Sequence, residues 1–276
     1  MDFPLARQRF YQEIHQPDEQ IDLATAALYI AQEEYSDLDV AEYLNTFDTM
    51  AVEVKERLPS EPYPLRILQT INQYLYEDLK FSGNTESYYD PRNSYLNEVI
   101  DRRIGIPITL SLVYLELARR IDFPMVGIGM PGHFLIRPVV GEMEIYVDPF
   151  HQGEILFAQD CQERLSQIYG KPIEIRPEFL QPISPRHFLA RMLSNLKAVY
   201  LTQSDIPRSL AAIERILLLF PDAPMEQRDR GLLYYQTGRW TEACQDLENY
   251  LAQVPTPDDA AVMRELLRRM GRDVEG

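Results

Sequence analysis

The sequence predicts an α+β fold that combines an N-terminal helical segment, a central core with a small antiparallel sheet packed on a buried helix, and a C-terminal array of helices. Three observations favour this fold class. Apolar residues recur at helical spacing in the N-terminal part, three segments in the middle alternate with period two after an apolar helix, and the C-terminal part repeats every 34 residues. These patterns divide the chain into domains at 1–80, 81–182 and 183–276.

Composition and charge restrict the function. The chain has 276 residues, 45% of them hydrophobic, and a formal net charge of −16. Residues 1–80 hold 16 acidic and 6 basic side chains, a balance that repels nucleic acid and anionic membranes, so neither is expected as a partner. The start of the chain resembles no signal segment, no run of about 18 apolar residues occurs, and the two cysteines match no metal spacing, so a reduced, cytoplasmic protein is expected.

The N-terminal segment is expected to cover the core without a catalytic role, because its polar residues are mainly carboxylates along solvated helix faces. Prolines separate its helices. The apolar residues that define these helices are Leu23, Ala26, Ala27, Ile30 and Ala31, and then Leu65, Leu68, Ile71, Leu75 and Leu79.

The ends of two helices in the central segment can be placed from the sequence. Asn93 or Ser94 is expected to cap a short helix that continues to Arg103 and is ended by Gly105. Pro107 suits the first turn of the next helix. That helix is apolar nearly all round and should therefore be the buried central helix of the core. Its apolar residues are Ile108, Leu110, Leu112, Val113, Leu115 and Leu117.

Three segments after the central helix alternate with period two and predict strands. The first covers residues 126–130. The next two, His133–Pro138 and Met143–Asp148, are expected to form a hairpin across the loop Val139–Glu142. A shorter helix is expected at 160–169.

The hairpin register follows from the alternation, because a slip of one residue would mix the two faces. The expected pairs are Pro138 with Met143, Phe134 with Val147, Ile136 with Ile145, Arg137 with Glu144, Leu135 with Tyr146, and His133 with Asp148. An imidazole opposite a carboxylate has a fixed tautomer and a stabilised imidazolium. His133 and Asp148 are therefore the candidate catalytic residues, and they form two thirds of a triad.

The C-terminal part has a helical repeat. Pro221 and Pro255 are 34 residues apart, and two helices per 34-residue unit are typical of tetratricopeptide repeats. Two units are too few to be stable alone, so they should pack on the core or on a second copy of the chain in a homo-oligomer. The first helices of the units should line a groove that binds a protein or peptide, or should only support the core. The expected groove residues are Asn195, Tyr200, Gln203, Arg230, Leu233 and Gln236.

Several motifs of the central segment resemble a known family. Tyr88–Asn97, Arg102–Ile108, Pro131–Leu135 and Val147–Phe150 resemble, in this order, the bacterial SirB family, which has a transglutaminase-like core followed by tetratricopeptide repeats. The resemblance covers nearly the whole chain and implies a papain-like α+β core. It also implies a cysteine nucleophile at the start of the central helix, a histidine base and an aspartate that orients it. His133 and Asp148 match the last two positions.

The nucleophile position does not match the resemblance. Its slot holds Pro107, which offers no nucleophile. Cys161 follows the aspartate in the chain, in the wrong order, and is interpreted as a buried structural cysteine. Thr109 points about 200° around the helix from the slot, and both it and Ser111 are interpreted as capping or packing hydroxyls.

Metal and cofactor sites are not expected. Asp148 and His151, three residues apart, could hold a metal together with His133, but three ligands without a fourth are a weak signal. The glycines have no phosphate-loop spacing and open no helix.

Three functions remain open. In the first, the chain is a non-catalytic transglutaminase-like protein that binds a protein or peptide as an adaptor or regulatory factor. In the second, it is a hydrolase or acyltransferase in which His133 and Asp148 use a non-cysteine nucleophile or an activated water. In the third, only the repeats matter and the protein is a structural adaptor. The missing thiol favours the first function, because a triad without its nucleophile loses most of its chemistry.

Overall fold

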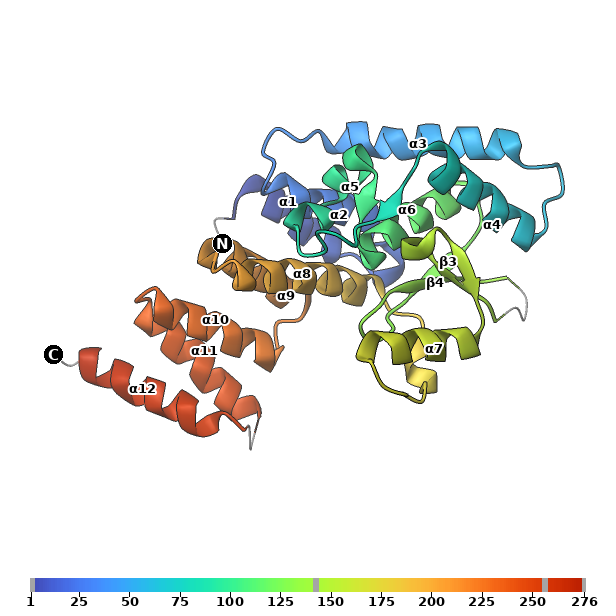
Figure 1. Ribbon diagram of the computed structural model, residues 1–276. Helices are drawn as coiled ribbons and strands as arrows, with labels where there is room; N and C mark the ends of the chain where they lie inside the picture. The colour runs from blue at the N-terminus through green and yellow to red at the C-terminus, as the bar shows by residue number, and fades with distance from the viewer. Residues whose placement is uncertain (1–2, 141–143, 255–257, 275–276) are drawn as a thin grey trace. The chain divides into compact units, whose positions relative to one another are not determined.

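The computed structural model describes residues 3–140, 144–254 and 258–274 (Figure 1). The chain forms two compact units, Met1–Met192 and Leu193–Gly276. The first unit combines helices with small sheets and the second is helical, so the expected α+β fold class is confirmed. The domain boundaries expected near 80 and 182 stay predictions. Within the described ranges, every helix is too short or too polar to span a lipid bilayer.

The N-terminal segment is helical, as expected, and its described residues form four α-helices rather than the two that the apolar spacing defined. Asp22 and Asp39 cap the second and third of them, because their carboxylates accept hydrogen bonds from first-turn backbone N–H groups. The last of these helices continues as a π-helical turn at Gln73–Asp78. The bounds are α1 (Leu5–Ile14), α2 (Leu23–Gln32), α3 (Val40–Arg57) and α4 (Pro64–Asn72).

The short helix of the core ends earlier than expected. It is α5 (Leu96–Arg102), and it follows a 3-10 turn at Pro91–Asn93, so neither Asn93 nor Ser94 is its N-cap. Arg103 itself takes the left-handed conformation, with φ of 57°, that the sequence assigned to a glycine two residues later. Gly105 lies instead in β2 (Ile104–Gly105), which pairs in parallel with β1 (Ser82–Gly83).

The central helix is confirmed as α6 (Pro107–Arg120), with Pro107 at its first position and every residue from Pro107 to Ala118 buried. An antiparallel sheet lies next to it in the order β3-β4-β5-β6, and α6 contacts β3 and β4 of this sheet. The strands are β3 (Met125–Ile128), β4 (Leu135–Pro138), β5 (Tyr146–Asp148) and β6 (Glu154–Leu156).

Helix α7 (Ala158–Tyr169) covers the sheet face that presents Leu135 and Tyr146 (Figure 1). Cys161 and Leu165 of α7 join these two residues in one buried apolar cluster. The hairpin therefore carries core residues on the face that the sequence assigned to its polar pairs.

The hairpin register is shifted by two residues from the expected one. Ile136 pairs with Val147, which places Leu135 rather than His133 opposite Asp148. A shift of two keeps every side chain on its face, so the alternation of apolar residues could not exclude it. The expected pair of Pro138 with Met143 lies outside the described residues. On its other side, Pro138 pairs with Met125 of β3.

The second unit consists of helices that pack on their chain neighbours from α9 onward. Gly231 brings α10 close to α11, since a Cβ there would lie 3.0 Å from the Leu247 side chain. Gly238 has a φ of +74° in the turn that joins the same two helices. The helices are α8 (Pro185–Thr202), which crosses the boundary between the units, α9 (Ile206–Leu219), α10 (Pro224–Gln236), α11 (Trp240–Gln253) and α12 (Ala260–Val274).

Candidate functional site

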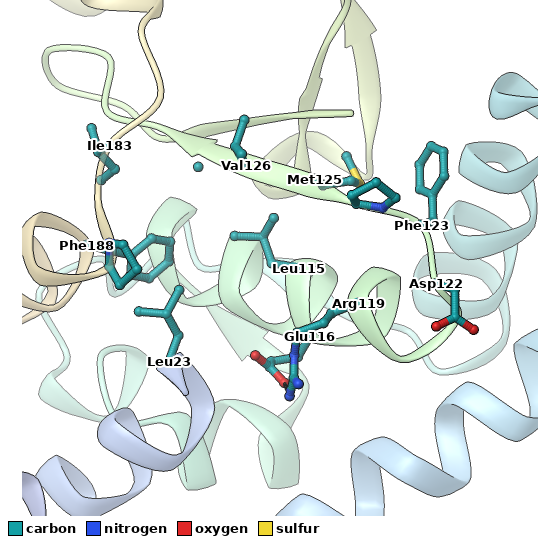
Figure 2. A pocket seen from close by; sticks show the side chains of 13 residues that line it. Leu23, Leu115, Glu116, Arg119, Asp122, Phe123, Met125, Val126, Ile183 and Phe188 are labelled. Atoms are coloured by element: carbon teal, nitrogen blue, oxygen red, sulfur yellow. Dashed lines mark hydrogen bonds and ion pairs between the residues drawn. The ribbon is translucent and has the colours of Figure 1, made fainter. Parts of the chain in front are cut away.

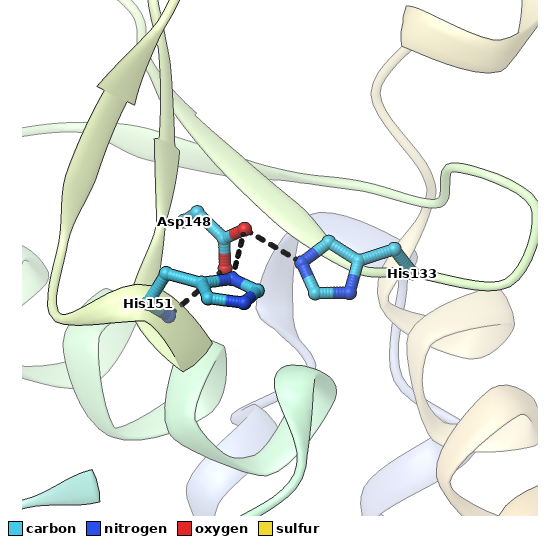
Figure 3. A group of neighbouring side chains, drawn as sticks. All are labelled: His133, Asp148 and His151. Atoms are coloured by element: carbon cyan, nitrogen blue, oxygen red, sulfur yellow. Dashed lines mark hydrogen bonds and ion pairs between the residues drawn. The ribbon is translucent and has the colours of Figure 1, made fainter. Parts of the chain in front are cut away.

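Asp148 is the centre of a buried hydrogen-bond network (Figure 3). Its side chain is 0% exposed, and its Oδ2 lies 2.8 Å from His133 Nε2 and 2.8 Å from His151 Nδ1. Its Oδ1 accepts the backbone N–H groups of Phe150 at 3.1 Å and His151 at 3.3 Å. One carboxylate thus orients two imidazoles, of which the sequence predicted one.

The local sequence explains how His151 returns to Asp148. β5 ends at Asp148, and Pro149 starts a 3-10 turn at Pro149–His151 that Asp148 caps with its own carboxylate. A residue three positions later on such a turn lies above the cap, so the His151 ring reaches Oδ2. The signal that could have identified this contact is an aspartate at a strand end, followed by proline and, two residues further, histidine.

The charge of Asp148 is stabilised although it is buried. Burial alone would raise the pKa of this carboxyl group, but the hydrogen bonds from His133 and His151 outweigh burial and hold the pKa of Asp148 well below its usual value. The guanidinium of Arg164 lies 3.6 Å from Oδ2 and also favours the ionised form. Asp148 is therefore an ionised hydrogen-bond acceptor, and it fixes the orientation of both imidazole rings.

The two histidines differ in access to solvent. The His133 side chain is 6% exposed, whereas that of His151 is 42% exposed. A substrate or ion from solution would therefore meet His151 first.

The main chain around His133 is held from two sides. Gly132 has a φ of +72°, which a residue with a side chain rarely adopts. Arg191 of α8 donates hydrogen bonds of 2.7 Å to the carbonyl oxygens of Met130 and His133, and burial lowers the pKa of this arginine. The imidazole of His133 therefore projects from a fixed backbone.

The start of α6 offers no nucleophile toward this network. Pro107, which offers no nucleophile, is the first residue of α6. The Thr109 hydroxyl donates to Asn93 O at 2.7 Å and accepts from Ile106 N at 3.1 Å, so it caps the helix, as expected. Ser111 is fully buried, and its Oγ has no hydrogen-bond partner among the described residues. Burial raises the pKa of the Cys161 thiol to about 12, which leaves it protonated and inert.

An aromatic strip lies next to the histidines. Tyr88 contacts Phe150 edge-on with ring centroids 6.3 Å apart, and Phe150 contacts His133 in the same way at 6.1 Å. Tyr88 also contacts Tyr89, which is 67% exposed. The buried Asn93 side chain holds this loop, because it donates to the carbonyl oxygens of Ser87 and Tyr88.

A mainly apolar cavity of about 520 Å³ lies along β3 (Figure 2). Leu115 of α6, Leu23 of α2 and Phe188 of α8 surround it, together with Val126 of β3. None of the three residues of the Asp148 network lines this cavity, so it is a separate feature of the first unit.

The six expected groove residues of the repeats do not form one exposed surface. Gln203 and Gln236 are exposed and Asn195 is half-buried. Tyr200 and Leu233 are buried, and Leu233 packs with Ile213 and Leu217 between the helices of the unit. A partner can therefore reach only part of the expected set, and the binding role of the repeats stays a prediction.

Arg230 forms an ion pair with a buried carboxylate. Its Nε lies 2.7 Å and its Nη2 2.8 Å from the two carboxylate oxygens of the buried Asp246. Gln227, the other polar departure from the repeat pattern, donates to Pro221 O at 2.9 Å and accepts from Gln253 at 2.8 Å. Both polar residues are thus satisfied inside the repeats.

Comparisons with known proteins agree with this architecture. Residues 41–194 match the transglutaminase-like superfamily, and residues 196–268 match the tetratricopeptide repeat. A UPF0162 protein of Xylella fastidiosa (strain 9a5c) is 39% identical over 255 residues, which cover 90% of this chain and 89% of the relative. A UPF0162 protein of Pseudomonas aeruginosa is 30% identical over 249 residues, or 90% of each chain.

A eukaryotic protein is similar to part of this chain. The F-box only protein 21 of Homo sapiens is 30% identical over 189 residues, which cover 64% of this chain and 29% of the human protein. With the family match over 41–194 and the full-length bacterial relatives, this chain belongs to the transglutaminase-like superfamily and to the UPF0162 proteins.

Proposed function

We propose that this protein is a non-catalytic, SirB-like member of its superfamily that acts as a protein- or peptide-binding adaptor in the cytoplasm. The observation that carries the proposal is Pro107 at the first position of α6, where acyl transfer needs a thiolate. No neighbour replaces that thiol: the Thr109 hydroxyl caps α6, and the Cys161 thiol is buried in an apolar cluster. Removal of the nucleophile takes away most of the rate enhancement of a triad.

Two surfaces suit a peptide partner. The first is the aromatic strip of Tyr89, Tyr88 and Phe150, because exposed aromatic side chains supply contact area at a low entropic cost. The second is the part of the repeat groove that remains accessible, at Gln203 and Gln236. Tetratricopeptide repeats present such grooves to protein partners.

Affinity capture from the native cell, followed by calorimetry with the partner that is identified, tests this function. Tyr89→Ala removes the exposed end of the aromatic strip, and Tyr63→Ala removes a tyrosine that is 60% exposed at the start of α4. Tyr89→Ala should weaken binding at least tenfold, about 1.4 kcal/mol, and Tyr63→Ala should leave it unchanged.

The repeats are tested with a matched pair of double variants. Gln203→Arg with Gln236→Arg changes the expected groove, whereas Gln245→Arg with Asn249→Arg places the same charges on exposed positions of α11. Loss of binding in the groove variant alone makes the repeats the binding module. If all four variants bind like the unmodified protein, both surfaces are excluded and the adaptor proposal fails for this partner.

A second function, a hydrolase that activates water, is favoured by one observation. His151 is accessible and is oriented by the buried Asp148, which is the arrangement of a general base and its supporting carboxylate. The base would then be His151 rather than His133. Turnover of an ester or amide that disappears in His151→Gln but persists in His15→Gln would favour this function over the adaptor.

A further inference from the structure

We propose that His133, Asp148 and His151 form a binding site for one divalent transition-metal ion. The donor atoms of the three side chains all lie within 4.8 Å of one another. They come from two backbone segments: the loop before β4, and the end of β5 with the turn that follows it directly. The chain has four histidines, and the other two, His15 and His187, are exposed. The structure thus gathers half of the histidines around one buried carboxylate.

The ligand set suits a metal such as Zn²⁺. Two imidazole nitrogens and one carboxylate oxygen leave a fourth position open on a tetrahedral ion. At metal–ligand distances near 2.1 Å, the donors of such an ion lie about 3.4 Å apart. The Asp148 oxygen is 2.8 Å from each imidazole nitrogen. Small side-chain rotations therefore lengthen these two distances and shorten the distance between the two imidazole nitrogens. Each neutral imidazole then carries its proton on its other ring nitrogen.

The surroundings of the donors are already organised for an ion. Asp148 Oδ1 is held by two backbone N–H groups, which leaves Oδ2 as the oxygen that faces both histidines. Arg191 fixes the main chain of His133. Such outer contacts orient metal ligands and raise affinity. The accessible ring of His151 gives the ion a route from solvent.

Arg164 is the group that opposes the ion. Its Nη1 lies 2.7 Å from His151 Nδ1 and 3.6 Å from Asp148 Oδ2, so it stands where a cation would approach. Its Nη2 is 2.5 Å from Glu154, which can retain the guanidinium when the ion enters. Removal of this competing charge should therefore strengthen metal binding, a result that a purely structural histidine pair does not predict.

The experiment uses the purified full chain after treatment with a chelator. Zn²⁺ is titrated in competition with a chromophoric chelator, and Co²⁺ absorption reports the coordination number. One equivalent should bind to the unmodified protein and to His187→Gln with equal affinity. His151→Gln should bind at least a hundredfold more weakly, and Arg164→Gln about tenfold more tightly.

Circular dichroism of each variant separates loss of a ligand from loss of the fold, and His151→Gln suits this purpose because its side chain is partly exposed. His133→Gln serves as a second ligand variant. Equal Zn²⁺ affinity in the unmodified protein and in folded His151→Gln would overturn the proposal, because any ion would then be held elsewhere. Binding that is no tighter in the unmodified protein than in folded His133→Gln would overturn it in the same way.

Discussion

Replacement of Asp148 by alanine tests the network at its centre. The change leaves the buried ring N–H of His133 without an acceptor and removes the cap of the 3-10 turn. An unsatisfied buried donor costs about 1–3 kcal/mol, and a lost cap costs about 1 kcal/mol. The substitution also removes a carboxylate whose burial is unfavourable, and this gain in free energy offsets part of these costs. We expect Asp148→Ala to lower the free energy of unfolding of the first unit by about 3 kcal/mol.

The assay is urea unfolding followed by circular dichroism. The one tryptophan of the chain, Trp240, lies in α11, so its fluorescence reports the second unit and helps to assign the transitions. The control is Asp39→Ala, which removes a carboxylate that caps α3 on the surface and has no histidine partner. The control should cost about 1 kcal/mol. If Asp148→Ala lowers the unfolding midpoint no more than Asp39→Ala at an equal denaturant slope, the network does not stabilise the fold.

Two further predictions concern single side chains. Because burial raises the pKa of Cys161 to about 12, a thiol reagent at pH 8 should modify the half-buried Cys244 in the native protein and Cys161 only after unfolding; mass spectrometry of the labelled peptides checks this order, and equal rates would contradict the burial of Cys161. Arg230→Ala leaves the buried carboxylate of Asp246 unpaired, which should destabilise the second unit by about 3 kcal/mol; Trp240 fluorescence during urea unfolding measures it, and an unchanged midpoint would show that the ion pair contributes nothing.

The alternation of the hairpin predicted the faces of its residues but not their partners. His133 lies in the loop before β4 and the register of the hairpin is shifted by two, so the two residues do not pair across the strands, although His133 Nε2 lies 2.8 Å from Asp148 Oδ2. Shifts of two preserve a period-two pattern, so the sequence could not distinguish these registers.

Other differences arise where tertiary contacts decide. Arg103 adopts a left-handed conformation that the sequence assigned to Gly105, and it donates a hydrogen bond to Leu79 O, far away in the chain. Tyr200 and Leu233 are buried although their repeat positions suggested a groove. None of these arrangements follows from local propensity.

The central claim is that the chain has lost acyl-transfer chemistry, and turnover measures it most directly. Purified protein is assayed with peptide, amide and ester substrates and with thiol-directed acyl probes, both with chelator and with added Zn²⁺. The proposed function, in which Pro107 stands at the start of α6 without a nucleophile, predicts no turnover above buffer and no labelled Cys161 in either condition. Substantial turnover that disappears in folded His133→Ala or His151→Gln would contradict the claim and identify an enzyme.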